Sequence, residues 1–219
     1  MRIRNKPWAK EELNESKIYI KEPENYKGSW KTAFLNSNNP IHLELGCGKG
    51  YFVKKAAILN PEINYIAIDL IDAILGVANR NILEEFKGKT PENVVLTRYD
   101  VENINNIIDI KDNIKRIYIN FCNPWPKPRH KKRRLTHTRQ LEKYKVFLEK
   151  GSEIYFKTDD DNLFNESLEY FREAGFKLIN KTYNLDSEPE FWQNIETEHE
   201  IQFKKQGIKI KAGIFYYLK

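Results

Sequence analysis

The sequence predicts an α/β fold with a mostly parallel sheet and an antiparallel strand pair near its C-terminal end. Short apolar, strand-like runs alternate with helix-like segments between residues 41 and 171, and such βαβ repeats form parallel sheets. Beyond them, two strand-like runs, 176–183 and 208–218, are separated by a charged segment without a long helix. They therefore predict antiparallel neighbours at the sheet edge.

The first repeats place glycines and acidic residues at strand ends. Residues 41–45 predict a strand, 46–50 (GCGKG) a glycine turn, and 51–59 a helix with apolar residues at helical spacing. A second strand, 65–68, ends at Asp69 before a helix that extends through Phe86. A third strand, 94–96, continues to Asp100.

The later repeats contain the most concentrated charge. A fourth strand, 117–121, stops at NPWP (123–126), here called the corner, and a basic loop follows at 127–134. Residues 135–148 predict a helix that Gly151 closes. A fifth strand, 154–156, precedes a helix that extends through Phe171.

Length and charge indicate one catalytic domain with a short appendage. The chain has 219 residues, enough to bury an ordinary core. Residues 1–31 are polar and lack a clean period, so they predict an N-terminal arm that precedes a domain at 32–219. The 37 Lys and Arg residues exceed the 31 Asp and Glu residues by six, which favours an anionic partner.

Cysteine usage and hydropathy indicate a reducing, cytoplasmic setting. Cys47 and Cys122 are the only cysteines and are not spaced as zinc ligands, so no metal is expected. The N-terminal residues do not resemble a signal peptide, and no run approaches the roughly 18 apolar residues of a membrane span. We therefore expect no membrane partner.

The glycine turn and its acidic neighbours predict S-adenosylmethionine as the cofactor. Asp69 follows the glycines by roughly 20 residues, where a carboxylate holds ribose hydroxyls. The spacing is G-x-G-x-G rather than the G-x-G-x-x-G of dinucleotide sites, and Glu44 before the turn repels pyrophosphate but attracts a sulfonium cation. Asp100 is placed to reach the adenine. With the terminal antiparallel pair, these features predict a Rossmann-like class I methyltransferase that binds its cofactor near Gly46, Gly48 and Gly50.

The corner lies beside the cofactor strand, at the sheet edge where open α/β sheets bind substrates. Pro124 and Pro126 restrict its backbone, and Trp125 offers an aromatic face. The segment is similar to the (Asn/Asp)-Pro-Pro-aromatic motif of amino-methyltransferases that act on flipped bases. The alternative is a strand-terminating turn with a buried tryptophan. A nucleophilic Cys122 is set aside, because a strand-end thiol more commonly packs as a small hydrophobic group.

The basic loop carries cations without a single acid in its own sequence. Six like charges repel one another in water, so neutralisation of RNA phosphates explains the loop better than a solvated surface does. The cations are Lys127, Arg129, Lys131, Lys132, Arg133 and Arg134.

Four segments resemble the signature blocks of the bacterial tRNA (guanine-N7-)-methyltransferases, in the same order. They are LELGCGKGYFV, INFCNPWPKPRHKKRRL, YFKTDDDNLF and TEHEIQFKKQG, and the resemblance covers most of the chain from about Ile41 onward. It implies tRNA (guanine(46)-N7)-methyltransferase activity, in which a methyl group passes from S-adenosylmethionine to a variable-loop guanine. It also implies that Glu44, Asp69 and Asp100 bind the cofactor and that Asn123 touches both cofactor and base.

The resemblance further implies where the substrate binds. Lys127, Asp159 and the segment Thr197, Glu198, His199 and Glu200 would contact the tRNA, and Arg129 joins them as a phosphate ligand of the basic loop. The chain departs from the family at two positions. The family usually has Asp where this chain has Asn123, and Tyr where it has His199.

The chemistry of guanine N7 favours positioning over proton transfer. N7 carries an in-plane lone pair, so no proton must leave before it attacks a methyl group. Positive charge then develops on the purine, and a nearby carboxylate stabilises it. Asn123 cannot supply this charge, although its amide can bond guanine O6. We therefore predict Asn123 and Asp159 as the catalytic pair, while a helix N-cap role for Asp159 is equally compatible with the sequence.

Two other functions stay open at this point. The Asn-Pro corner is also compatible with adenine-N6 methylation of RNA. A third interpretation is an RNA-binding module of the same fold that Asn123 has made inactive. The sequence leaves the oligomeric state undecided, with a homodimer as one option.

Overall fold

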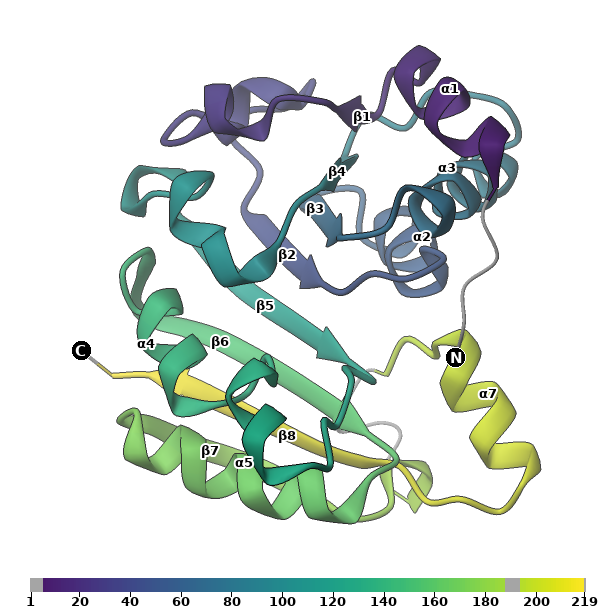
Figure 1. Cartoon of the computed structure of the whole chain (residues 1–219). Coiled ribbons are helices and arrows are strands. Elements are labelled where there is room, and N and C mark those ends of the chain that lie inside the picture. The colour runs from purple at the N-terminus through teal and green to yellow at the C-terminus, as the bar shows by residue number, and fades with distance from the viewer. Residues whose placement is uncertain (1–5, 188–193, 219) are drawn as a thin grey trace.

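An eight-stranded sheet forms the centre of the computed structural model, which describes residues 6–187 and 194–218 (Figure 1). The spatial order is β1-β4-β3-β2-β5-β6-β8-β7, and all neighbours are parallel except the two pairs that include β8. The predicted α/β fold with a C-terminal antiparallel pair is confirmed. The strands are β1 (Tyr19–Ile20), β2 (Ile41–Leu45), β3 (Asn64–Asp69), β4 (Val94–Arg98), β5 (Ile114–Asn120), β6 (Leu148–Thr158), β7 (Phe176–Thr182) and β8 (Lys211–Tyr217).

Helices cover both faces of the sheet, because side chains alternate between faces along each strand. On β3, Ile66 and Ile68 join a core with residues of α4 and α5, whereas Tyr65 and Ala67 join one with residues of α2 and α3. No helix in the described ranges is long and apolar enough to cross a bilayer. The α-helices are α1 (Pro7–Glu15), α2 (Tyr51–Leu59), α3 (Asp72–Glu85), α4 (Thr138–Tyr144), α5 (Asp161–Glu173) and α7 (Glu198–Lys205).

The N-terminal segment packs on the sheet from residue 6 onward. β1 pairs with β4, and α1 lies against α3 where Gly76 leaves room for Ala9. Trp30 is fully buried and donates its Nε1 proton to the Ile107 carbonyl at 2.6 Å. Asp112 accepts the Trp30 backbone N–H at 3.0 Å. The described part of this segment therefore shares the core of the domain that follows it.

The helix predicted over residues 135–148 is wrong in its extent. α4 spans only Thr138–Tyr144, and β6 begins at Leu148. Phe147 and Leu148 are both buried, and Leu148 is already the first residue of a strand, since a short apolar run suits a strand as well as a helix. Gly151 closes no helix. It lies within β6 with a φ of 87°, where a bulge shifts the register against β5.

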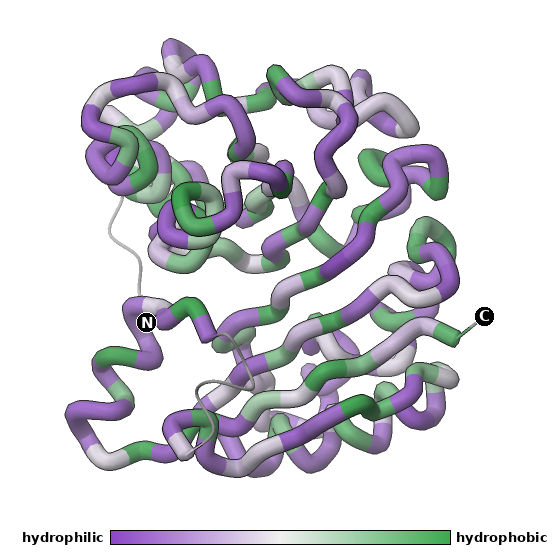
Figure 2. The backbone as a smooth tube through the Cα atoms, turned by 180° about the vertical axis from the view of Figure 1, so that it is seen from behind, coloured by the Kyte–Doolittle hydropathy of each residue, from purple (hydrophilic) through white to green (hydrophobic). Residues whose placement is uncertain are grey.

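The order of the strands positions the site. β2 leads through α2 to β3 on one side, and β5 leads through α4 to β6 on the other, so the order reverses between β2 and β5. At such a switch point, ligands bind in the crevice at the carboxyl ends of the strands. The glycine turn and the corner both lie at this edge. The mostly hydrophilic helix α7 lies beside it (Figure 2).

Candidate active site

The glycine turn keeps its shape through left-handed backbone conformations and one carboxylate. The φ angles are 75° at Gly46, 55° at Gly48 and 73° at Gly50, which other residues rarely adopt. Asp69, at the end of β3, accepts the backbone N–H groups of Gly48 at 3.0 Å and Ile71 at 3.1 Å. A Cβ atom on Gly48 would meet nothing within 4 Å, so this backbone is open to a ligand. Each Asp69 oxygen keeps a second lone pair for a ligand hydroxyl.

Glu44 is a buried carboxylate with one satisfied oxygen. The whole residue is only 2% exposed. Its Oε1 accepts a hydrogen bond from Asn120 Nδ2, at the end of β5, at 3.1 Å. Oε2 has no partner among the described residues. Burial raises the pKa of Glu44 to about 8, while the Asn120 hydrogen bond and the Lys157 charge act in the opposite direction. An unpaired buried oxygen is costly, so Glu44 fits a ligand that brings a cation or a donor.

Asp100 lies at the exposed rim of the same edge. It follows β4, and its Oδ1 accepts the Glu102 backbone N–H at 3.0 Å as the N-cap of a short 3₁₀ helix. Since β4, β3 and β2 are neighbours, the structure brings Asp100, Asp69 and Glu44 to consecutive strand ends.

The corner is a turn held by its own side chain. β5 ends at Asn120, and the exposed Asn123 beyond it accepts the Trp125 backbone N–H on Oδ1 at 3.0 Å. Trp125 has a φ of 41°, which is uncommon outside glycine. Its ring is only partly buried and packs against His130 and Arg133, with 5.6 Å between ring centroids and 5.2 Å from guanidinium to ring. The corner and the basic loop therefore form one packed unit.

Asp159 is free of the helix-capping role. Asp160 is the N-cap of α5, and its Oδ1 accepts the Leu163 backbone N–H at 2.7 Å. The interpretation of Asp159 as the N-cap is therefore wrong. The Asp159 carbonyl accepts Lys211 Nζ from β8 at 2.9 Å, which fixes the backbone at the end of β6.

The basic loop divides into structural and exposed cations. Glu166 on α5 accepts Lys131 Nζ and Arg134 Nη1, each at 2.6 Å. Arg134 is 2% exposed and also donates Nε to the Pro124 carbonyl at 2.7 Å. The loop has no acid in its own sequence, but Glu166 from a helix distant in sequence pairs with Lys131 and Arg134, so these two cations have a structural role. The exposed cations are Lys127, Arg129, Lys132 and Arg133.

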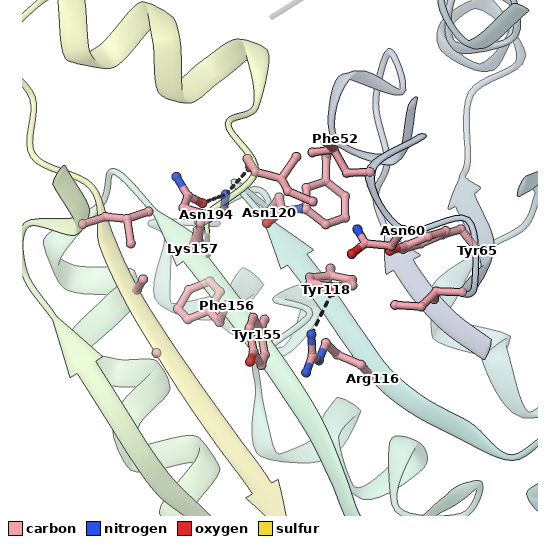
Figure 3. A pocket seen from close by; sticks show the side chains of 16 residues that line it. Phe52, Asn60, Tyr65, Arg116, Tyr118, Asn120, Tyr155, Phe156, Lys157 and Asn194 are labelled. Carbon is pink, nitrogen blue, oxygen red and sulfur yellow. Dashed lines mark hydrogen bonds between the residues drawn. The ribbon is translucent and has the colours of Figure 1, made fainter. Parts of the chain in front are cut away.

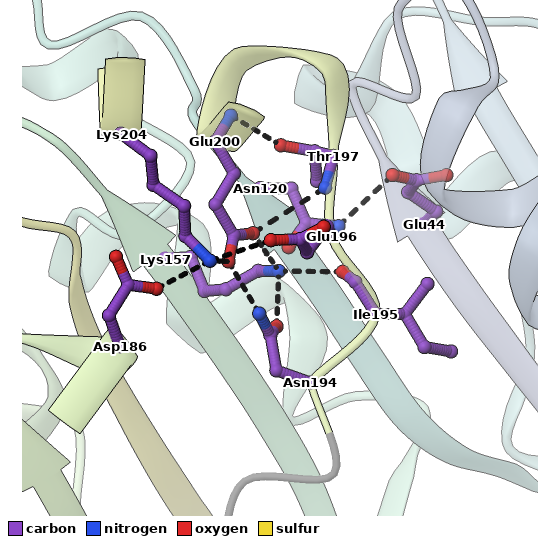
Figure 4. A network of polar contacts seen from close by, with 10 residues as sticks. All are labelled: Glu44, Asn120, Lys157, Asp186, Asn194, Ile195, Glu196, Thr197, Glu200 and Lys204. Carbon is purple, nitrogen blue, oxygen red and sulfur yellow. Dashed lines mark hydrogen bonds and ion pairs between the residues drawn. The ribbon is translucent and has the colours of Figure 1, made fainter. Parts of the chain in front are cut away.

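Two of the four predicted substrate residues at the start of α7 are occupied within the protein. Thr197 and Glu200 form a capping box, in which Thr197 Oγ1 accepts the Glu200 N–H at 3.1 Å. Glu200 is 0% exposed and accepts Lys157 Nζ at 2.9 Å (Figure 4). Their side chains stabilise the helix start and its attachment to the sheet.

The other two residues, Glu198 and His199, connect α7 to the rest of the site. Glu198 pairs with Lys49 of the glycine turn at 2.9 Å. The exposed His199 ring lies 5.9 Å from the ring of Phe121, which follows β5. The start of α7 thus contacts both segments that flank the switch point.

Two residues that sequence reasoning missed complete the site. Asn120 and Lys157 are register neighbours on β5 and β6, and each is 8% exposed. A signal was available, because Asn and Lys within otherwise apolar strands require buried partners. Both line a cavity of about 330 Å³ on the α2 face of the sheet, together with Phe52 and Tyr118 (Figure 3).

Cys122 is unsuited to nucleophilic chemistry. Burial raises its pKa to about 12, so the thiol stays protonated near neutral pH. It packs against the core formed with α4 and α5. The interpretation of Cys122 as a packing residue is therefore favoured.

Comparison with known proteins identifies close relatives across nearly the whole chain. Residues 38–212 match the model of a family described as putative methyltransferase. A tRNA (guanine-N(7)-)-methyltransferase of Clostridium beijerinckii is 54% identical over 213 residues, which cover 96% of each chain. A relative of the same name from Ruminiclostridium cellulolyticum is 51% identical and covers 99% of this chain and 92% of its own.

Solved structures share the fold at much lower identity. The 16S rRNA methyltransferase KamB has a TM-score of 0.60 at 15% identity, with coverage of 83% of this chain and 89% of its own. An antibiotic-related methyltransferase has a TM-score of 0.58 at 16% identity and covers 100% and 97% of the two chains. These likenesses support the class I methyltransferase architecture of the sheet.

Replacement of Arg134 by Met is expected to lower the free energy of unfolding by about 1–3 kcal/mol, because Pro124 O and Glu166 lose a charge-assisted donor. Lys132→Met removes an exposed cation of the same loop and is expected to change this free energy by less than about 0.5 kcal/mol. Urea denaturation measures both variants. Equal midpoints would contradict a structural role for Arg134.

Proposed function

This chain belongs to the tRNA (guanine-N(7)-)-methyltransferase family, and we propose that it methylates N7 of a variable-loop guanine in tRNA with S-adenosylmethionine as donor. The observation that carries the proposal is the meeting of the glycine turn, the corner and the start of α7 at one sheet edge. The site thereby combines the unpaired Glu44 carboxylate oxygen, the polar corner and the exposed cations of the basic loop.

The residues at this edge fit the proposed cofactor. S-adenosylmethionine supplies a methyl group activated by a sulfonium, together with an ammonium, a ribose and an adenine. Glu44 offers an unpaired buried oxygen to positive charge, and the open glycine turn admits a close ligand. Asp69 retains lone pairs for ribose hydroxyls, and the exposed Asp100 stands two strands from Glu44.

The base would be held between the corner and the end of β6. Asn123 positions guanine through its amide, and Asp159 supplies negative charge as the purine becomes cationic. Because N7 needs no deprotonation, orientation of the base against the methyl group provides most of the rate. Asp160, not Asp159, is the N-cap of α5, and this supports the assignment of Asp159 to the base.

The exposed cations of the basic loop would hold the phosphates beside the extruded base. Lys127 and Arg129 follow the corner directly, and Arg134 fastens the corner to α5. Base and backbone are then fixed from one short segment, which explains why no spacer separates the corner from the loop.

The decisive experiment is methyl transfer from labelled S-adenosylmethionine to unmodified tRNA, followed by digestion to nucleosides and mass analysis. We expect 7-methylguanosine. N6-methyladenosine would support adenine methylation instead, and the absence of any methylated nucleoside would support an inactive RNA-binding module.

Cofactor affinity is expected to rise with pH below the Glu44 pKa of about 8, because the cationic ligand binds the ionised carboxylate. The dissociation constant should fall by up to about tenfold per pH unit between about pH 5.5 and 7, where the cofactor's own ammonium stays protonated. Calorimetry in buffers of different ionisation enthalpy measures the accompanying proton release. Glu44→Gln should remove the slope and Asp100→Asn should keep it. A flat profile in the wild type would exclude this linkage.

The catalytic pair is tested by three substitutions. Asn123→Ala is expected to lower turnover about 10- to 100-fold and Asp159→Asn at least as much, whereas Asn123→Asp should be tolerated or improve turnover. Single-turnover methylation of one tRNA transcript measures all three, with folding confirmed by circular dichroism. Wild-type rates in both Asn123→Ala and Asp159→Asn would leave the corner a steric role only.

Neutralisation of Arg129, Lys132 and Arg133 together is expected to weaken tRNA binding and reduce its salt slope by about 2 to 3. Cofactor affinity should stay unchanged, since these exposed side chains belong to the basic loop and not to the glycine turn, although Arg133 also packs on Trp125. Filter binding over a series of salt concentrations measures the slope. An unchanged slope would mean that these charges do not contact phosphate.

A further inference from the structure

Lys157 is a buried cation whose three hydrogen bonds all reach one segment. Nζ donates to Asn194 Oδ1 at 2.9 Å, to the Ile195 carbonyl at 3.0 Å and to Glu200 Oε2 at 2.9 Å (Figure 4). These acceptors lie in residues 194–200, here called the entry segment because it leads into α7. An ammonium has three protons, so this segment uses the full donor capacity of Lys157.

We propose that Lys157 is a positioning residue of the methyl transfer reaction, which fastens the entry segment to β6 and thereby places the start of α7 over the cofactor edge. The inference rests on the proposed function and assigns a role to a residue of the YFKTDDDNLF segment for which the sequence predicted none.

The register of the sheet explains why this position can act at the site. Lys157 on β6 is paired with Asn120 on β5, and Asn120 donates to Glu44 on β2. A line of polar side chains therefore crosses three neighbouring strand ends, from Glu44 to Lys157 and then to Glu200 of α7. Displacement of the entry segment would change the distance between α7 and the cofactor edge.

Besides the contact of His199 with Phe121, the α7 start has an ion pair to the glycine turn, which is weaker than the attachment through Lys157. The ion pair from Lys49 to Glu198 is exposed, with 49% and 23% of the two side chains accessible, and such pairs contribute little. The pair from Lys157 to Glu200 is buried, with 10% and 0% accessible. Burial lowers the pKa of Lys157, while the Glu200 charge beside it favours the protonated form. The buried pair therefore holds the segment more firmly than the exposed pair does.

The ion pair between Lys157 and Glu200 can be removed without loss of the capping box that begins α7. Glu200 bonds Lys157 and also accepts the Thr197 backbone N–H at 3.4 Å. Glutamine serves in a capping box as well as glutamate does. Lys157→Met with Glu200→Gln thus removes both buried charges and keeps the cap, whereas Lys157→Met alone would leave the buried Glu200 carboxylate with Lys204, at 3.7 Å, as its cationic partner.

The test compares this double variant with a matched pair elsewhere. Lys54 on α2 is 14% accessible and pairs at 2.8 Å with Glu85 on α3, which is 36% accessible, so Lys54→Met with Glu85→Gln makes the same chemical change at a more exposed pair between two helices. For each protein we would measure thermal unfolding, cofactor affinity by calorimetry, kcat and KM for tRNA, and amide exchange of residues 197–205 without tRNA.

The Lys157 and Glu200 double variant is expected to stay folded and to lose about 10- to 100-fold in kcat/KM for tRNA at saturating cofactor. Saturation is needed because the Lys157 charge lowers the pKa of Glu44, so its loss also weakens cofactor binding. Its amides at 197–205 should exchange faster, while those of the strands stay protected. Wild-type kcat/KM, or exchange equal to that of the Lys54 and Glu85 variant, would overturn the inference.

The product of the wild-type reaction distinguishes a failure of the proposed function from a failure of this inference. Formation of 7-methylguanosine by the wild type, with no loss in the double variant, would overturn the positioning role alone. Absence of 7-methylguanosine from the wild-type reaction would overturn the proposed function and this inference together.

Discussion

The burial of a few polar groups at the carboxyl ends of β2, β5 and β6 governs the architecture of the site. Glu44, Asn120, Lys157 and Glu200 are each nine-tenths buried or more, so each requires a partner of matching chemistry. Asn120 and Lys157 donate to the acids on either side of them, but Glu44 Oε2 and Asn120 Oδ1 have no partner among the described residues. The Glu44 oxygen is the one that bears a carboxylate charge. That oxygen lies at the edge where the glycine turn opens, so the cofactor of the proposed reaction would supply its missing partner.

The apolar packing of the sheet offsets the free-energy cost of burying these polar groups. Alternate residues of each strand pack into two cores on opposite faces, and helices α2 to α5 cover them. The strand ends are therefore held rigidly, and loops that begin at these ends inherit defined positions. The glycine turn, the corner and the end of β6 need little additional structure to face one another. Asp69 and Asp160 stabilise the loops by accepting hydrogen bonds from backbone N–H groups.

The basic loop shows how one charged segment can serve both folding and binding. Arg134 and Lys131 both pair with Glu166, and Arg134 also donates to the Pro124 carbonyl, so the corner is held against α5. Four further cations stay exposed next to this braced turn. A rigid polar corner beside free positive charge suits a substrate whose reactive base is attached to phosphates on both sides.

The sequence by itself determined the order of the βαβ repeats, the glycine turn, the strand-end acids and the family, because these depend on local periodicity and contiguous motifs. Only the tertiary structure decided the extent of α4, the place of Gly151 within β6, and the packing of the N-terminal segment through Trp30. It also decided that Asp160 rather than Asp159 caps α5, and that Lys157 and Asn120 belong to the site. Each of these depends on partners far apart in the chain, such as Glu166 for Arg134 or Glu200 for Lys157, and a local pattern carries no record of such partners.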